Sequence, residues 1–162
     1  MVHPLQHIPD LARLLFLHGV EDVVISPGSR NAPLIRAFYK DFGANCLSIV
    51  DERSAAYFAL GQSLTSKKPT VLICTSGTAV LNYAPAVAEA FYQGVPLLVI
   101  TADRPAEWVG QQDNQAVSQH NVFGKNVKAA FSLPVESANN DSLWFAHRTI
   151  NEAFHLTVSA TA

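Results

Sequence analysis

Four short runs of apolar residues are the feature that most constrains the fold. They read DVVI at 22–25, CLSIV at 46–50, TVLIC at 70–74 and PLLVIT at 96–101. Because these runs are mostly continuous rather than alternating, they are typical of strands buried on both faces of a parallel sheet. A weaker run at 127–133 predicts a fifth strand.

The segments around these runs have helical patterns. Helices are predicted at 11–17, 32–39, 52–66, 78–92 and 142–156. Asp51 is placed to cap the third helix, and Gly19 and Gly94 follow the first and the fourth. Strands that alternate with helices over short connections predict an α/β fold. The expected architecture is a three-layer sandwich, in which helices cover both faces of a flavodoxin-like, mostly parallel sheet.

The chain has 162 residues, which suits a single domain over 1–162 with its core at about 8–156. Only 15% of the residues are charged, whereas a soluble domain usually has about 25%. This shortage indicates surface that other domains or a partner subunit cover. We therefore expect exposed apolar patches on the helices at 52–66 and 78–92, and self-association. The small residues at 159–162 suggest the start of a linker, or a point where a longer protein was cut.

Charge and hydropathy argue against several classes of protein. A net charge of −2 gives no electrostatic case for binding nucleic acid or an anionic membrane. No apolar run approaches the roughly 20 residues of a membrane span, and we see no secretory signal. Cys46 and Cys74 lie in strand-like runs, where we interpret them as small buried hydrophobes in a reducing cytoplasm rather than as a disulfide. We expect a cytoplasmic protein without a zinc site.

In a parallel sheet, ligands gather at the carboxyl ends of the strands. The loop after the first run reads SPGSRNAP at 26–33. Gly28 permits tight backbone geometry, and Ser29 and Arg30 lie where the next helix begins, an arrangement that can receive a carboxylate or a phosphate. An ordinary turn with a surface arginine explains the same local pattern equally well.

Glu52 opens the helix that follows the second run. Taken alone, a first-turn carboxylate is most simply explained by the helix dipole. Behind it, however, Ala55, Ala59 and Gly61 form a face of small residues. Such a face can pack closely against a neighbour, which would hold Glu52 in a defined position.

Two further loops carry polar groups. In TSGT at 75–78, Gly77 lets the backbone approach a ligand, although simple helix capping by Thr75 or Ser76 is the stronger local interpretation. TADRP at 101–105 leads into the polar stretch QQDNQ at 111–115. Arg104 beside Asp103 could be only a local ion pair, but a long polar loop at this edge is more often functional.

The histidines offer no general base. His120 is interpreted as a polar loop residue, and the others as solvated or capping residues (His3, His7, His18, His147 and His155). Together, the four loops place two arginines, a carboxylate and several hydroxyls and amides at one edge of one sheet. That combination suits a small polyanionic substrate.

The motifs SPGSR, DER, TSGTA, TADRP and NQA occur in this order between residues 26 and 116. With them the chain resembles, from about Ile8 to Leu156, the N-terminal pyrimidine-binding domain of the 2-succinyl-5-enolpyruvyl-6-hydroxy-3-cyclohexene-1-carboxylate synthases. These are the thiamine diphosphate-dependent transferases of menaquinone biosynthesis. The E-x-x-A-x-x-x-A-x-G segment from Glu52 suits many thiamine-dependent decarboxylases, whereas the pair SPGSR and TADRP narrows the resemblance to this family.

The resemblance implies thiamine diphosphate as cofactor, with 2-oxoglutarate and isochorismate as substrates. Glu52 matches the family's catalytic glutamate, which hydrogen-bonds the aminopyrimidine and favours the tautomer that removes the thiazolium proton. The ylid so formed decarboxylates 2-oxoglutarate, and the resulting carbanion adds to isochorismate. The implied cofactor contacts also include Thr75, Ser76, Gly77 and Thr78. The implied substrate contacts are Ser29, Arg30, Arg104, Asn114 and Gln115.

The family enzyme is longer than this chain. The resemblance implies a homodimer or homotetramer of three-domain subunits, in which a C-terminal domain binds the diphosphate through Mg²⁺ or Mn²⁺. The Gly-Asp-Gly motif of that domain is absent here, so we expect no metal ligand in this chain and no activity from it alone. Two alternatives stay open: the pyrimidine domain of another thiamine diphosphate-dependent decarboxylase or ligase, and a free-standing flavodoxin-like domain that binds a nucleotide or a protein.

Overall fold

Four parallel strands form the central sheet of the computed structural model, which describes residues 3–159. They are β1 (Asp22–Ile25), β2 (Cys46–Ser48), β3 (Thr70–Cys74) and β4 (Leu97–Thr101). The order is β2-β1-β3-β4, and each neighbouring pair is parallel. The chain therefore runs outward from β1 to β2 and then crosses to β3 on the other side of β1. This is the doubly wound, flavodoxin-like order, and it has a switch point between β1 and β3.

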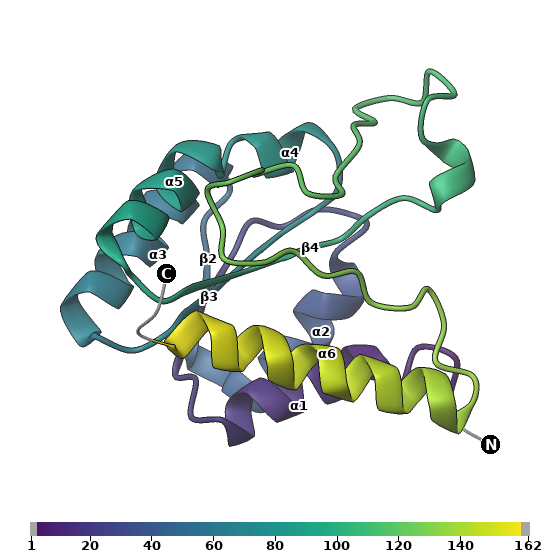
Figure 1. The fold of residues 1–162 in the computed structure, drawn as a ribbon, viewed down its shortest axis with the longest axis horizontal. Helices are drawn as coiled ribbons and strands as arrows, with labels where there is room; N and C mark the ends of the chain where they lie inside the picture. Colours follow the sequence, from purple (N-terminus) through teal and green to yellow (C-terminus); the bar gives the residue numbers. More distant parts are fainter. Residues whose placement is uncertain (1–2, 160–162) are drawn as a thin grey trace.

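Helices cover both faces of this sheet (Figure 1). One face carries α1 (His7–Leu17), α2 (Ala32–Phe42) and α6 (Asn140–Val158), and the other carries α3 (Glu52–Ser66), α4 (Thr78–Leu81) and α5 (Ala84–Gln93). The predicted α/β sandwich is thus confirmed. The boundary signals are confirmed as well: Asp51 accepts the Ser54 N–H at 2.8 Å, and Gly94 ends α5 with φ 65°.

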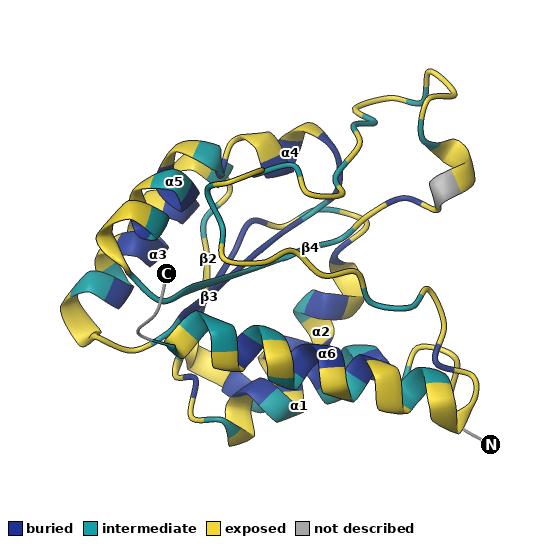
Figure 2. Cartoon of the chain, in the orientation of Figure 1, coloured by how far each residue is buried: buried dark blue, intermediate teal, exposed yellow. Residues whose placement is uncertain are grey.

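The core consists of two apolar clusters, one on each face of the sheet (Figure 2). Successive residues of one strand join different clusters: Val23 and Ile25 face α1, α2 and α6, whereas Val24 faces α3 and α5. Burial on both faces explains why the strand sequences are continuously apolar. Cys46 and Cys74 are buried and free, as predicted.

The single helix predicted at 78–92 is wrong, because α4 ends at Leu81 and α5 begins at Ala84. Pro85 has no N–H to donate to the Leu81 carbonyl, and its ring collides with that carbonyl in a continuous helix. The Tyr83 N–H instead donates to Val80 O at 3.1 Å, which closes a tighter turn.

The fifth strand predicted at 127–133 is also absent from the described part of the chain. This segment lines the same hollow as β4 and does not pair with it. Val127 packs on one core cluster and Leu133 on the other, while Phe131 between them is exposed. Anchoring at both ends leaves the intervening backbone next to solvent, where it needs no ladder partner.

Several large apolar side chains are exposed, as the shortage of charge predicted. Tyr57 and Phe58 lie on α3, Leu81 ends α4, and Tyr92 lies in the last turn of α5. Exposed Trp144 and Phe145 on α6 were not predicted, and self-association stays a prediction. Between residues 3 and 159, no helix combines the length and the apolarity needed to cross a bilayer. Three of the four residues predicted to start a linker, 160–162, lie outside the described residues.

Candidate functional site at the carboxyl edge of the sheet

The loops after β1 and β3 touch at the switch point of the sheet. Gly28 lies so close to Thr75 that a Cβ atom at position 28 would be 2.5 Å from the Thr75 Cβ atom. The buried side chain of Asn31 fixes the first loop, since it accepts the Gly28 N–H at 2.8 Å and donates to Ser26 O at 2.9 Å. The close approach of two loops therefore accounts for glycine at position 28.

Tyr83 contacts both the start of the loop after β1 and the end of β3. Its side chain is fully buried, and its hydroxyl donates to Ile73 O at 2.9 Å and lies 3.3 Å from Ser26 Oγ. Burial raises the pKa of Tyr83 above its ordinary value, and burial raises the pKa of the Cys74 thiol to about 12. The negative charge of Glu52 acts in the same direction on both pKa values.

Glu52 is the half-buried first residue of α3. Ala55 and Ala59 behind it are completely buried against the sheet, so the predicted close packing is confirmed for them. It is wrong for Gly61, which is exposed and has no atom within 4 Å of a Cβ placed there. Among residues 3–159, the Glu52 carboxylate has no hydrogen bond or ion pair. The packing therefore holds in place a carboxylate that is free to bind.

The loop at 75–78 is engaged by the chain itself. Ser76 is buried, and its hydroxyl accepts from Arg104 Nη1 at 3.3 Å. The Gly77 N–H donates to Gln119 Oε1 at 2.6 Å, and a Cβ at position 77 would lie 2.0 Å from Gln115 O. Gly77 itself is the N-cap of α4, with no capping side chain, so the capping interpretation of Thr75 and Ser76 is wrong. Thr78 is exposed.

Arg104 anchors the long polar loop that follows β4. Its side chain is only 5% exposed, and its guanidinium donates to the Asp113 carboxylate, to Ser76 Oγ and to Asn114 O. Asp103 does not pair with this guanidinium; it accepts the backbone N–H of Arg104 at 2.7 Å. The local ion pair considered from the sequence is thus replaced by a pair with Asp113.

Arg30 reaches the same carboxylate from the loop after β1. Its Nη2 atom lies 3.8 Å from Asp113 Oδ2, the oxygen to which Arg104 also donates. The hydrogen bond from Arg104 holds the pKa of Asp113 below its usual range, and the charges of Arg104 and Arg30 add to that effect. The two arginines expected to bind a substrate therefore meet at an internal carboxylate.

The structure brings most of the predicted residues to one edge. Ser29 is exposed beside Arg30, and Asn114 and Gln115 contribute backbone carbonyls toward Arg104 and Gly77. Sequence reasoning missed Asp113 and also Gln119, which bonds Gly77 and donates to Ala102 O at 2.8 Å. Both lie in a polar stretch with no periodicity, where no local signal distinguishes a partner from a solvated side chain.

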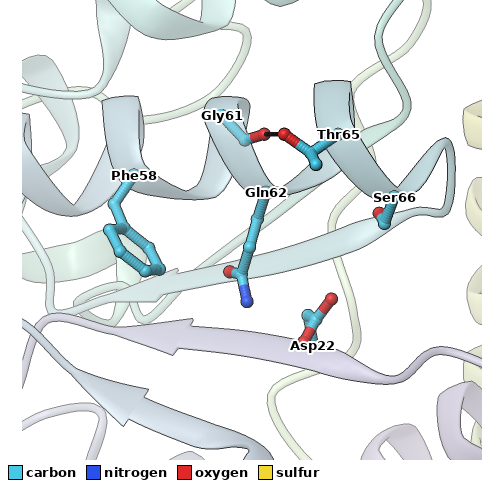
Figure 3. Close-up of a pocket in the computed structure, with 6 residues that line it drawn as sticks. All are labelled: Asp22, Phe58, Gly61, Gln62, Thr65 and Ser66. Carbon is cyan, nitrogen blue, oxygen red and sulfur yellow. Dashed lines mark hydrogen bonds between the residues drawn. The ribbon is translucent and has the colours of Figure 1, made fainter.

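Two hollows lie near these elements. The larger, of about 710 Å³, separates β4 from the segment at 119–135 and reaches Arg30 and Arg104. The smaller, of about 500 Å³, lies between α3 and the start of β1, at the amino edge of the sheet (Figure 3). Gln62 points from α3 toward the sheet there, and its Oε1 atom is buried without a partner among the described residues. Only the larger hollow borders residues of the predicted site.

His7 and His120 line the larger hollow, and one prediction about the histidines is wrong. His7 is buried rather than solvated: its backbone N–H donates to Ser137 Oγ at 3.1 Å, and its ring Nδ1 is 3.0 Å from the same atom. Burial lowers the pKa of His7, and Asp10 opposes that effect. In the range 3–159, no group of three or more His, Cys, Asp or Glu side chains is arranged to hold a metal.

Comparison with known proteins agrees with this geometry. Residues 9–138 match the family model described as "Thiamine pyrophosphate enzyme, N-terminal TPP binding domain". The chain is 52% identical over 153 residues to the 2-succinyl-5-enolpyruvyl-6-hydroxy-3-cyclohexene-1-carboxylate synthase of Cytophaga hutchinsonii, and 53% identical over 154 residues to that of Desulfotalea psychrophila. These matches cover 94% and 95% of the chain, but only 27% and 29% of the two relatives.

A solved structure supports the fold. The benzoylformate decarboxylase of Polynucleobacter necessarius superimposes with a TM-score of 0.64 at 23% identity, over 75% of this chain and 23% of that protein. Since the family model matches residues 9–138, which are most of the chain, the chain belongs to the thiamine pyrophosphate enzyme N-terminal TPP-binding domain family.

Proposed function

We propose that this chain supplies the pyrimidine-binding half of the active site of a thiamine diphosphate-dependent synthase. The whole enzyme would decarboxylate 2-oxoglutarate and add the succinyl semialdehyde unit to isochorismate. The observation that carries the proposal is the half-buried Glu52 carboxylate, which has no partner among residues 3–159 and begins α3 at the carboxyl edge of the sheet. The names of relatives that are about half identical to the chain support the choice of reaction.

The residues at this edge fit the cofactor's aminopyrimidine ring. Glu52 can accept a hydrogen bond from a protonated ring nitrogen, and thus hold a proton there, because nothing in the described chain neutralises it. The Asp51 cap and the buried Ala55 and Ala59 keep its helix in place. We propose that the loop at 75–78 lines the same ring. When bound, the cofactor supplies the carbanion-stabilising chemistry, and the protein supplies orientation and proton management.

The arginines fit the charge of the substrates. Both 2-oxoglutarate and isochorismate carry two carboxylates, and guanidinium groups bind carboxylates through strong, paired hydrogen bonds. We assign this role to Arg30 and Arg104, helped by Ser29, Asn114 and Gln115. The half-exposed Arg30 can be reached from solvent, whereas Arg104 is covered by the loop at 111–115.

We further propose that the remaining parts of the site come from outside this chain. The chain spans less than a third of the relatives that it matches. A central domain, a diphosphate-binding domain with Mg²⁺ or Mn²⁺, and a second subunit of a cytoplasmic homodimer or homotetramer would complete the enzyme. The exposed apolar residues on α3 and α6 provide surface for such contacts. This chain alone would therefore bind the cofactor weakly and have no activity.

A chimera tests the proposal. This chain replaces the matched 153 residues of the Cytophaga hutchinsonii relative, and the product is assayed for consumption of isochorismate with 2-oxoglutarate or pyruvate as donor. We expect activity with 2-oxoglutarate, none with pyruvate, and none from the chain alone. Preference for pyruvate would favour another decarboxylase or ligase of the same type, and a chimera that folds but binds no thiamine diphosphate would favour a free-standing binding domain.

Glu52→Gln in this chimera tests the central residue. The amide keeps the shape of the side chain but cannot act as a proton-holding carboxylate, so turnover should fall by on the order of 100-fold or more while cofactor binding persists. Glu89→Gln, an equal change of charge on the exposed side of α5, should leave turnover unchanged. Near-normal turnover of Glu52→Gln would remove Glu52 from the proposed role.

A further inference from the structure

Two loops that are far apart in sequence, one after β1 and one after β4, meet at one carboxylate oxygen. Asp113 Oδ2 accepts from Arg104, which follows β4, and lies 3.8 Å from Nη2 of Arg30, which follows β1. Asp113 itself sits on the polar loop beyond Arg104. Because two guanidinium groups converge on it, this carboxylate occupies the position that a carboxylate ligand of the two arginines would need.

Arg104 uses three of its five N–H donors in this arrangement, and its burial keeps a ligand from the other two. Each of its three nitrogens already donates: Nε to Asp113, Nη1 to Ser76 and Nη2 to Asn114 O. Its side chain is 5% exposed, whereas that of Arg30 is 43% exposed. A ligand carboxylate can therefore approach Arg30 from solvent, but it can bind both arginines together only if it displaces Asp113.

The loop that carries Asp113 is held by its contacts rather than by its own backbone preference. Gln112 and Gln115, on either side of Asp113, both have φ of 58°, a left-handed backbone conformation that residues other than glycine rarely adopt. The Arg104 bonds to Asp113 and Asn114 O hold this conformation. Replacement of Asp113 by a ligand would remove one of these two bonds and weaken the restraint on this unfavourable conformation.

We propose that Asp113 is an internal competitor for anionic substrates, so that it sets the affinity of the Arg30–Arg104 pair for carboxylates. This inference rests on the proposed function, in which the two arginines receive substrate carboxylates. Binding is an exchange: the ligand carboxylate takes the place of Asp113 between the guanidinium groups, and Asp113 moves into water with its loop. The binding free energy of the ligand contains only the difference between its own ion pair with the arginines and that of Asp113. Asp113 therefore lowers the affinity of the two arginines for the ligand.

Titration of the 162-residue chain with 2-oxoglutarate tests the exchange. Asp113→Asn keeps the shape of the side chain and one hydrogen-bond acceptor but removes the competing charge. We expect it to bind 2-oxoglutarate on the order of tenfold more tightly than the parent, as for loss of a charge-assisted competitor. Asp113→Glu restores the charge, and Glu107→Gln makes the same change of charge on an exposed residue of this loop; both should bind within about twofold of the parent.

Trp108 reports the movement of the loop independently of affinity. The chain has two tryptophans, Trp108 and Trp144, so a Trp144→Phe background leaves Trp108, between Arg104 and Asp113, as the single tryptophan. Saturation with 2-oxoglutarate should shift its emission in the parent. The shift should be smaller in Asp113→Asn, because the loop has already lost its anchoring charge. A residue with only a structural role would not produce this pattern.

The outcomes separate the inference from the proposed function. Equal or weaker binding by Asp113→Asn, in a variant whose circular dichroism matches the parent, would show that Asp113 orients the arginines and does not compete. Absence of 2-oxoglutarate binding in every variant would also overturn the inference. Neither measurement uses thiamine diphosphate or turnover, whereas failure of the proposed function appears as an inactive chimera.

Discussion

Replacement of Gly28 by alanine tests the contact on which the candidate site is built. A Cβ at this position would lie 2.5 Å from Cβ, 2.7 Å from Cγ2 and 2.8 Å from Oγ1 of Thr75. Favourable carbon–carbon contacts lie at about 3.5–4.0 Å, so the loops after β1 and β3 must separate by roughly an ångström. Both loops are continuous with buried strands, and neither can move without disturbing the core.

The expected cost follows from these distances. Overpacking of this kind destabilises a fold by about 1–3 kcal/mol, and the smaller entropy of an unfolded chain with alanine offsets about 0.4–1 kcal/mol. We therefore expect Gly28→Ala to lower the free energy of unfolding by about 1–2 kcal/mol. Urea unfolding followed by far-ultraviolet circular dichroism measures this value, and an unchanged m-value shows that the transition has kept its character.

Two further variants show whether the contact with Thr75 is the cause. Thr75→Gly removes the atoms that the new methyl group meets, so Gly28→Ala should cost much less in that background, with a coupling energy of about 1–2 kcal/mol. Gly61→Ala is the matched control: nothing lies within 4 Å of the added Cβ on the exposed side of α3, and the change should stabilise by about 0.5–1 kcal/mol. If Gly28→Ala is as stable as the parent, or costs equally in both backgrounds, the two loops do not meet as described.

Two predictions concern buried polar groups. Tyr83→Phe removes the donor to Ile73 O and should lower the free energy of unfolding by about 0.5–1.5 kcal/mol. The control, Tyr92→Phe on the exposed end of α5, should have no effect. Equal changes in the free energy of unfolding for the two variants would exclude the buried hydrogen bond. Burial holds the folded-state pKa of His7 below the ordinary 6.5. As the pH falls below about 6.5, the unfolded chain therefore binds a proton that the buried ring does not, and the folded state loses stability. The free energy of unfolding should be lower at about pH 5.5 than at about pH 7.5 in the parent, and this drop should be smaller in His7→Gln. An equal drop in both proteins would contradict the prediction.

Some elements were predictable because their cause is local. The strand at 70–74 is apolar at nearly every position, and the structure buries each of its residues. Asp51 marks the start of α3, because a capping side chain needs only the N–H groups of the next turn. The break before α5 could also have been predicted, since Pro85 is visible in the sequence and excludes a continuous helix.

The fifth strand shows where local information ends. The apolar residues at 127–133 suit a strand, but pairing requires a partner edge in register. Val127 and Leu133 instead anchor the segment to different core clusters. Likewise, the sequence identified the small residues behind Glu52 but could not distinguish the buried Ala55 and Ala59 from the exposed Gly61. Which side of a helix meets the sheet at each turn depends on the docking of the whole helix.

Local sequence patterns were enough to predict the layered architecture and the edge of the sheet at which Glu52, Arg30 and the loop at 75–78 gather. Apolar periodicity, capping and strand direction act within one element or between neighbours, and all of them can be inferred from the order of residues. It takes the folded chain to show that Arg104 pairs with Asp113 rather than with the adjacent Asp103, and that Arg30 joins them. The strength of an ion pair depends on separation and burial in space, which follow from where β1 and β4 place the loops that carry these residues.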